Sequence, residues 1–172
     1  MTYMRGLTLL AAAVALSACS TDPNRFGDGD GGVGTDSAFG ADGFAGAGDP
    51  SSPIYFSQTI GDRVLFVVDT STLTSEAQTV LAGQADWLTT NPEFTAIIEG
   101  HADERGTREY NLALGARRAS AVQDFLVSRG VAPGRLRTVT YGKERPLEIC
   151  SDEACYSQNR RAVTVITAGL AG

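Results

Sequence analysis

Two residues of opposite charge, Asp103 and Arg118, are the side chains of this sequence best suited to hold a small charged ligand. A carboxylate accepts hydrogen bonds from an ammonium group, and a planar guanidinium donates two parallel hydrogen bonds to a carboxylate. Side chains of these two types that converge on one edge of a fold could therefore bind a zwitterion. The alternative that the pattern leaves open is that Asp103 and Arg118 simply pair with each other.

A long amphipathic helix is expected from residue 108 to residue 129, ended by Gly130. At 100° per residue its apolar positions fall within an arc of about 80°, which is the face expected to pack on a core. A neighbouring arc at the edge of that face carries polar groups. The core face comprises Leu112, Gly115, Ala119, Val122 and Leu126, and the neighbouring arc comprises Asn111, Leu114 and Arg118.

The polar loop 100–107 leads into this helix and contains Asp103. Loops held by a rigid scaffold are where binding residues concentrate. His101, Asp103 and Glu104 could instead serve a hydrolase, but no Ser or Cys nucleophile motif and no metal-ligand set accompanies them. His101 is the only His of the sequence and is expected to be a structural hydrogen-bonding residue. We therefore expect a protein that is not an enzyme and that has no metal site and no cofactor.

Alternating strand and helix signals predict an α/β fold. A capping-box pattern, Ser75 with Gln78, indicates the start of a helix that Asn91 and Pro92 end. The expected order is β-α-β-α-β-loop-β, with helices packed on a mixed four-stranded sheet. The expected strands cover residues 64–68, 94–99, 136–141 and 161–167.

The formal net charge is −6 over 172 residues, and the sequence has no basic run or aromatic-basic patch. Nucleic acid is therefore not an expected partner. Residues 20–52 contain nine Gly, six Asp and few large apolar side chains, which is too little apolar surface to offset the entropy of ordering. Residues 19–52 are thus expected to form a flexible linker with an r.m.s. span of roughly 30 Å, with or without a spacing role.

The first 18 residues are predicted to be a signal peptide, because a positive start precedes an apolar run over residues 6–16. That run is too short to span a bilayer, which takes about 20 residues. The segment Leu16-Ser17-Ala18-Cys19 resembles a bacterial lipobox, in which the cysteine is acylated and becomes the first mature residue. Where the lipoprotein sorting rule of enteric bacteria applies, an Asp after the acylated cysteine would favour retention in the inner membrane. Ser20 stands at that position, which points to the outer membrane. The alternative is an ordinary signal peptide that happens to contain a cysteine.

Four sequence segments between Val64 and Thr167 together resemble the OmpA-like peptidoglycan-binding domain family. The resemblance implies an OmpA-like β-α-β-α-β-β sandwich over residues 53–172 that binds peptidoglycan non-covalently. One departure is visible, because the family often has an aromatic and a basic residue next to the position of Asp69. The matching segments are Ile98–Thr107, Tyr110–Ala119, Tyr141–Pro146 and Asn159–Val163, and the departing positions are Val68, Thr70 and Ser71.

The resemblance also implies a ligand and a set of site residues. The Asp and Arg of the family that match Asp103 and Arg118 bind the free amino-acid end of diaminopimelate in the cross-bridge peptide. One of two adjacent arginines orders the binding loop; we favour Arg160 and expect Arg161 to be solvated. Positions expected to line the same pocket are Leu114, Ala119, Asn111 and the backbone near Asp69.

Three cysteines are present, and acylation of Cys19 would leave Cys150 and Cys155 as an even pair. The periplasm is oxidising, so we expect a disulfide between these two residues. The alternative is a pair of free thiols.

A lipobox followed by a linker is similar to the layout of those family members that are lipoproteins of the Tol system. This likeness implies a lipid anchor in the outer membrane, a domain facing the periplasm, and a role in envelope integrity and in outer-membrane constriction at division. It implies peptidoglycan, TolB and other Tol-system proteins as partners. Three alternatives remain open: an OmpA-like lipoprotein that anchors the wall outside the Tol system, a purely structural spacer, and a flagellar stator component, which would carry a transmembrane helix instead of a lipid.

Overall fold

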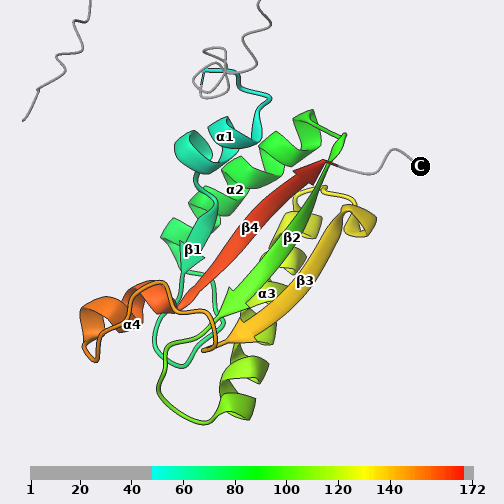
Figure 1. Ribbon diagram of the computed structural model, residues 1–172. Coiled ribbons are helices and arrows are strands. Elements are labelled where there is room, and N and C mark those ends of the chain that lie inside the picture. Colours follow the sequence, from blue (N-terminus) through cyan, green and yellow to red (C-terminus); the bar gives the residue numbers. More distant parts are fainter. Residues whose placement is uncertain (1–47, 169–172) are drawn as a thin grey trace, which may run out of the picture. The chain divides into compact units, whose positions relative to one another are not determined.

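The computed structural model describes residues 48–168, so the predicted signal peptide, Cys19 and most of the predicted linker lie outside the described residues. A mixed four-stranded sheet forms one layer, and helices pack on one of its faces (Figure 1). This arrangement confirms the predicted α/β fold. The elements are α1 (Pro53–Tyr55), η2 (Phe56–Gly61), β1 (Arg63–Leu65), α2 (Ser75–Thr90), β2 (Phe94–His101), α3 (Arg108–Ser128), η3 (Pro133–Arg135), β3 (Leu136–Gly142), α4 (Glu153–Asn159) and β4 (Arg161–Ala168).

The sheet has the strand order β1-β4-β2-β3. Strand β4 pairs antiparallel with both β1 and β2, whereas β2 and β3 run parallel and are connected through α3. Along β2, Ala96 and Ile98 are buried, whereas Ile97 and Glu99 between them are only half-buried. Because of these strand directions, the ends of β1, β2 and β3 lie next to the start of β4 at one end of the sheet, at the bottom of Figure 1.

Helix α3 approaches the sheet closely at that same end. A Cβ atom on Gly115 would lie 2.8 Å from the carbonyl oxygen of Gly100, and a Cβ atom on Gly100 would overlap the carbonyl oxygen of Gly115. Any larger side chain at either position would push the helix away from β2. The two glycines therefore set the distance between the start of α3 and the loop that follows β2.

The first predicted strand is longer in the sequence prediction than in the structure. The apolar run 64–68 predicts a strand over all five residues, but β1 ends at Leu65. Phe66 is still buried, and its amide donates to the carbonyl of Arg160 at 2.8 Å, whereas Val67 and Val68 are 57% and 44% exposed. The chain leaves the sheet here, and the apolar run continues into an exposed loop.

Two helix predictions also differ from the structure. The N-cap of α2 is Thr74, not Ser75: its hydroxyl accepts from the amide of Ala77 at 3.2 Å, and Gln78 instead donates to the carbonyl of Leu73. The segment predicted as a loop before the last strand contains α4, capped by Asp152. None of the helices within residues 48–168 is long and apolar enough to cross a membrane.

The core face of α3 is wider than its apolar pattern predicts. Leu112, placed on the core face by the sequence, is half-buried, whereas Leu114 and Arg118 from the neighbouring arc are buried. The first half of α3 is covered by the loop after β1 as well as by the sheet, because Arg118 donates hydrogen bonds to that loop. The polar arc is therefore buried under the loop.

Candidate ligand-binding site

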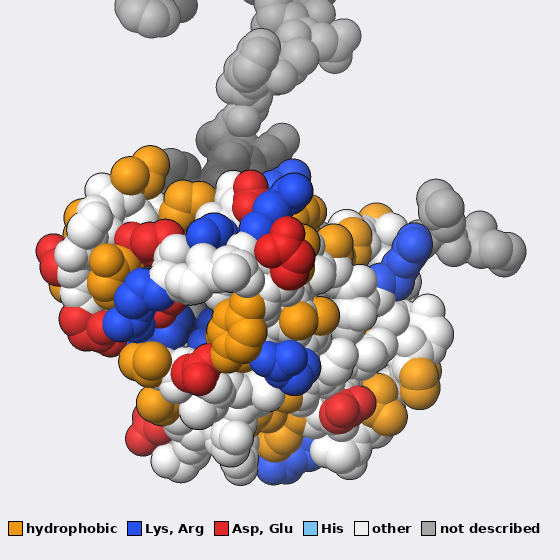
Figure 2. All heavy atoms as spheres, turned by 90° about the horizontal axis from the view of Figure 1, so that it is seen from below, with side chains coloured by type: hydrophobic (Ala, Val, Ile, Leu, Met, Phe, Trp, Pro, Cys, Tyr) orange, Lys and Arg blue, Asp and Glu red, His pale blue; other side chains and the backbone are white. Residues whose placement is uncertain are grey.

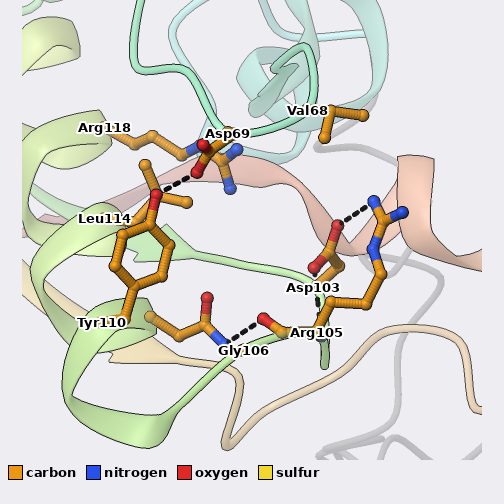
Figure 3. A pocket seen from close by; sticks show the side chains of 9 residues that line it. Val68, Asp69, Asp103, Arg105, Gly106, Tyr110, Leu114 and Arg118 are labelled. Atoms are coloured by element: carbon orange, nitrogen blue, oxygen red, sulfur yellow. Dashed lines mark hydrogen bonds and ion pairs between the residues drawn. The ribbon is translucent and has the colours of Figure 1, made fainter.

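A pocket of about 250 Å³ lies at this end of the sheet, between the loop after β1, the loop after β2 and the first turns of α3 (Figure 3). On the face that carries these loops, side chains of both charges lie among hydrophobic ones (Figure 2). Two carboxylates and two guanidinium groups line the pocket, so their charges balance. The lining residues are Val68, Asp69, Asp103, Arg105, Gly106, Tyr110, Asn111, Leu114 and Arg118.

The structure brings five of the seven predicted ligand-binding residues to the pocket wall: Asp69, Asp103, Asn111, Leu114 and Arg118. The other two lie elsewhere. Ala119 is fully buried in the core, next to Gly100. Arg160 is not a lining residue, and among the hydrogen bonds within residues 48–168 it reaches the pocket lining through Asp103. Ala119 and Arg160 can therefore affect a ligand in this pocket only through the residues that they support.

Arg118 is the largest fully buried side chain of the described residues. Its Nε donates to the carbonyl of Thr70 at 2.9 Å, and its terminal nitrogens donate to the carbonyls of His101 at 2.8 Å and Val67 at 3.3 Å. Burial lowers the pKa of Arg118 to about 10, although the negative charge of Asp103 opposes this effect. Arg118 therefore remains a cation at neutral pH, and it joins the loop after β1 to the end of β2.

Two hydrogen-bond donors of Arg118 remain available. A guanidinium carries five N–H groups, and three of them donate to the carbonyls described above. Each terminal nitrogen thus keeps one N–H for which residues 48–168 provide no acceptor. Two neighbouring N–H groups are what a planar carboxylate accepts. The structure adds a role that the sequence did not predict, because the same side chain also fixes the pocket wall.

Asp103 pairs with Arg105 and Arg160, and no hydrogen bond or ion pair joins it to Arg118 within residues 48–168. Its Oδ2 accepts from Arg105 at 2.8 Å and from Arg160 at 3.2 Å, and its Oδ1 accepts from the Arg105 amide at 3.2 Å. Burial acts to raise the pKa of Asp103, but hydrogen bonds from the two arginines lower it below its ordinary value. Asp103 is therefore ionised at neutral pH.

Arg160 connects three segments around the pocket. Besides Asp103, it donates to the carbonyl of Phe66 at 3.2 Å and to the carboxylate of Glu153 at the start of α4. Its side chain is only 6% exposed. The role of Arg160 in ordering the binding loop stays a prediction, and these contacts are the ones through which it would act.

Asp69 and Tyr110 form the side of the pocket opposite Asp103 and Arg105 (Figure 3). Asp69 has a φ of 60°, a left-handed backbone conformation that Asp adopts more readily than most residues. Its carboxylate accepts a hydrogen bond from the Tyr110 hydroxyl. Leu114 is 5% exposed and supplies apolar surface, and Asn111 donates to the carbonyl of Arg105 at 2.8 Å.

Four lining residues are not among the predicted site residues: Val68, Arg105, Gly106 and Tyr110. A signal for Tyr110 exists in the sequence, since it precedes Leu114 by four positions and Arg118 by eight, so all three share one helix face. Arg105 has a weaker signal, because it only follows Asp103 by two positions in a polar loop.

Two predictions for residues beside the pocket are wrong. Arg161 is 7% exposed rather than solvated, and its Nε and one terminal nitrogen are buried without a hydrogen-bond partner. His101 is 2% exposed, and its ring makes no hydrogen bond of normal geometry; Oε2 of Glu99 lies 3.6 Å from its Nε2. Burial, followed by the charges of Arg161 and Arg145, lowers the pKa of His101 to about 4. The contribution of His101 to the site is its backbone carbonyl, which accepts from Arg118.

A disulfide joins Cys150 and Cys155, as the cysteine count predicts. It links the loop before α4 to the first turn of that helix, where Glu153 contacts Arg160 and Tyr156 lies under Arg105 at 4.6 Å. Asn159 at the end of α4 accepts from the amides of Leu147 and Glu148. The segment after β3 is thereby held against the pocket residues.

This domain is of the α/β class, with helices packed on one face of a mixed sheet. It has a charge-balanced pocket at one end of that sheet. The model of the OmpA family matches residues 65–160. The chain therefore belongs to the OmpA family.

Two relatives that match this chain over most of their length are both peptidoglycan-associated lipoproteins. The chain is 51% identical to the peptidoglycan-associated lipoprotein of Mesorhizobium japonicum over 160 residues, covering 92% of this chain and 89% of the relative. It is 41% identical to the peptidoglycan-associated lipoprotein of Legionella pneumophila, covering 92% of each.

Solved structures show the same fold. The crystal structure of the peptidoglycan-associated lipoprotein from Burkholderia pseudomallei superimposes with a TM-score of 0.63 at 39% identity, covering 70% of this chain and 98% of that chain. The C-terminal domain of Helicobacter pylori MotB superimposes with a TM-score of 0.59 at 18% identity, covering 63% and 86%. The MotB likeness concerns the fold alone.

Proposed function

We propose that this pocket binds the free amino-acid end of diaminopimelate in the peptide of peptidoglycan, without chemical turnover. The observation that carries the proposal is that one small pocket is lined by Asp103 and by Arg118, which keeps two N–H groups without an acceptor within residues 48–168. Asp103 accepts from the ligand ammonium, Arg118 donates to the adjacent carboxylate, and Leu114 packs on the aliphatic stem. The balanced charge of the wall suits a ligand that is itself neutral overall.

The name of the relatives supports the same ligand class, since proteins sharing about half of this sequence are called peptidoglycan-associated lipoproteins. Binding needs no nucleophile, and the lining residues that the structure describes include no Ser, Cys or Thr side chain that could attack a peptide bond. Fragments released from peptidoglycan by the pure protein would instead favour the hydrolase alternative.

Calorimetric titration of muramyl peptides tests the ligand. A peptide ending in diaminopimelate should bind, and the matched lysine-type peptide, which lacks the second carboxylate, should bind poorly. Asp103→Asn should weaken binding roughly 10- to 150-fold, because a hydrogen bond to a charged group contributes roughly 1.5–3 kcal/mol. Arg108→Ala is the matched control, since Arg108 pairs with Glu144 outside the pocket. Equal binding of the two peptides would contradict the proposed ligand, and near-wild-type affinity of folded Asp103→Asn would contradict the site.

We also propose that residues 1–18 are removed, that Cys19 is acylated, and that residues 20–52 tether the domain, residues 53–172, to the outer membrane on its periplasmic side. The sequence Leu16-Ser17-Ala18-Cys19 supports this proposal. Several buried acyl chains anchor firmly, because each methylene contributes about 0.8 kcal/mol. Mass spectrometry of the mature protein should find the lipid on Cys19, and Cys19→Ala should be mislocalised. A mature chain that starts after Cys19 would contradict the anchor.

The proposed partners are TolB and other Tol-system proteins, with a role in envelope integrity and outer-membrane constriction at division. Surface around the Gly100–Tyr110 loop suits a protein partner: Glu104 is exposed there, and Val67 and Val68 are exposed beside it. TolB and wall peptide should then compete. Unchanged TolB affinity at saturating peptide would contradict competition. Binding to purified sacculi without any TolB binding would favour a wall anchor outside the Tol system, and no binding to sacculi would favour a purely structural spacer.

A further inference from the structure

Asp103 is already occupied in the ligand-free protein. An ionised carboxylate offers about four lone-pair sites, and Asp103 uses three of them for Arg105 and Arg160. A ligand ammonium, with three donors and a positive charge, would approach a carboxylate that already contacts two guanidinium groups. One acceptor site on Oδ1 remains, but an ammonium there would lie beside the like charge of Arg105, so full access to Asp103 requires one of the two arginines to move.

The two arginines differ in how easily they can move. The side chain of Arg160 is 6% exposed and is also bonded to the carbonyl of Phe66. The side chain of Arg105 is 45% exposed, and Asp103 is the only residue to which it donates a side-chain hydrogen bond within residues 48–168. Arg105 also lines the pocket (Figure 3). Arg160 is not among the lining residues. Arg105 is therefore the exchangeable partner.

The Arg105 guanidinium already contacts two side chains of α4 besides Asp103. Oε2 of Glu153 is 3.7 Å from the terminal nitrogen that donates to Asp103, and the ring of Tyr156 lies 4.6 Å from the guanidinium carbon. A short movement toward α4 would keep Arg105 paired with a carboxylate and stacked on an aromatic ring. Asp103 would retain Arg160 and gain a free face toward the pocket.

We infer that Arg105 stands in for the ligand ammonium on Asp103 in the free protein, and that ligand binding breaks this hydrogen bond and moves the Arg105 guanidinium closer to Glu153, still against Tyr156. The inference rests on the proposed function of the pocket and makes Arg105 a specificity-determining residue. A ligand with an ammonium group compensates Asp103 for the loss of Arg105. A ligand with a neutral group at that position leaves the Asp103–Arg105 pair closed and is excluded.

Affinities of four variants test the displacement. The probes are a soluble muramyl peptide ending in diaminopimelate and the same peptide with its terminal amine acetylated. Arg105→Ala removes the competitor and should tighten binding of the amine probe roughly two- to five-fold, the range expected for a partly exposed ion pair. Arg108→Ala removes an equal charge from a pair outside the pocket and should leave binding unchanged. The acetylated probe should bind weakly to wild type and to Arg108→Ala, and it should gain affinity in Arg105→Ala, where no Asp103–Arg105 pair excludes it.

As a single substitution, Glu153→Gln should weaken binding of the amine probe, also roughly two- to five-fold, because Arg105 loses the carboxylate that it pairs with once it has left Asp103. In the Arg105→Ala background the same change should have little effect, so the two substitutions are coupled. Weaker binding to Arg105→Ala, or additive effects of the two changes, would overturn the inference and leave the proposed function standing. Failure of the amine probe to bind wild type and Arg105→Ala alike would overturn both.

Discussion

The two sides of the pocket are held by different kinds of interaction. On one side, buried Arg118 donates to the carbonyls of Val67 and Thr70 in the loop after β1. On the other side, Asp103 is held by ion pairs, and one partner, Arg105, is half exposed. The first side uses a single deeply buried cation and backbone acceptors. The second uses ion pairs between side chains, and water and salt can reach one of these, the Arg105 guanidinium.

This difference determines which side can respond to a ligand. A buried guanidinium cannot leave its carbonyls without stranding them unsatisfied, so the side held by Arg118 is rigid. An exposed ion pair contributes little net free energy and can exchange partners at small cost. A ligand carboxylate would therefore meet preformed donors on Arg118, whereas a ligand ammonium has to replace a partner of Asp103. The pocket combines a fixed anion site with an exchangeable cation site.

The largest expected effect comes from removing the rigid side. Arg118→Ala should lower the free energy of unfolding by at least about 3 kcal/mol, because three carbonyls lose a charged donor worth roughly 1.5–3 kcal/mol each. Arg105→Ala, on the exchangeable side, should change the urea midpoint little. Arg118→Lys keeps the charge and should recover part of the stability, but it should not recover peptide affinity, because an ammonium cannot replace the planar fork. Equal midpoints for Arg118→Ala and Arg105→Ala would remove the distinction between the two sides.

Loss of the disulfide should affect mainly the exchangeable side. The bond between Cys150 and Cys155 holds the start of α4, which carries Glu153 and Tyr156. Closure of so short a loop contributes roughly 2 kcal/mol in the chain-entropy model. The Cys150→Ser, Cys155→Ser double variant should therefore be less stable by about that amount, and amide exchange should accelerate in α4 more than in α3. Equal acceleration in both helices would show that α4 is not an independent support.

Much of the fold could be predicted from the sequence, because the helix and strand periods are strong in α3, β2 and β4. The first strand was predicted too long, since the apolar run continues past Leu65 into exposed Val67 and Val68. Helix α4 was not predicted, because its seven residues carry no apolar period and depend on the Asp152 cap and a disulfide.

The candidate site could be predicted only in part. Asp103 and Arg118 follow from residue type and position, but their actual partners depend on long-range contacts that no local pattern contains. Arg118 reaches backbone carbonyls 48 and 51 positions away in the sequence, and Asp103 is paired with Arg160 across 57 positions. Ala119, assigned to the pocket by resemblance, lies in the core instead.

The pH dependence of the free energy of unfolding tests whether the imidazole of His101 is as inaccessible to water as its burial indicates. The folded pKa of about 4 lies below the ordinary value of 6.5, so the unfolded chain binds more protons between these pH values. Stability is then fully present above pH 6.5 and is lost as pH falls toward 4. Between pH 7.5 and pH 5 the loss should be about 2 kcal/mol at 1.36 kcal/mol per pKa unit. Urea unfolding at both pH values measures it, and His101→Leu should abolish this part of the pH dependence. A wild-type curve that is flat over this range would mean that water reaches the imidazole.

The smallest expected effect concerns the Tyr110–Asp69 hydrogen bond, which is an exposed contact on the otherwise rigid side. Tyr110→Phe removes the hydroxyl and keeps the ring, so the buried Arg118 contacts that hold the same loop remain. The urea midpoint should therefore stay at the wild-type value. Exchange of the Asp69 and Thr70 amide hydrogens should become faster, because Asp69 loses its partner while its left-handed backbone conformation remains. If the midpoint fell as far as in Arg118→Ala, the loop would be held mainly by the exposed contact. The assignment of rigidity to the buried arginine would then be wrong.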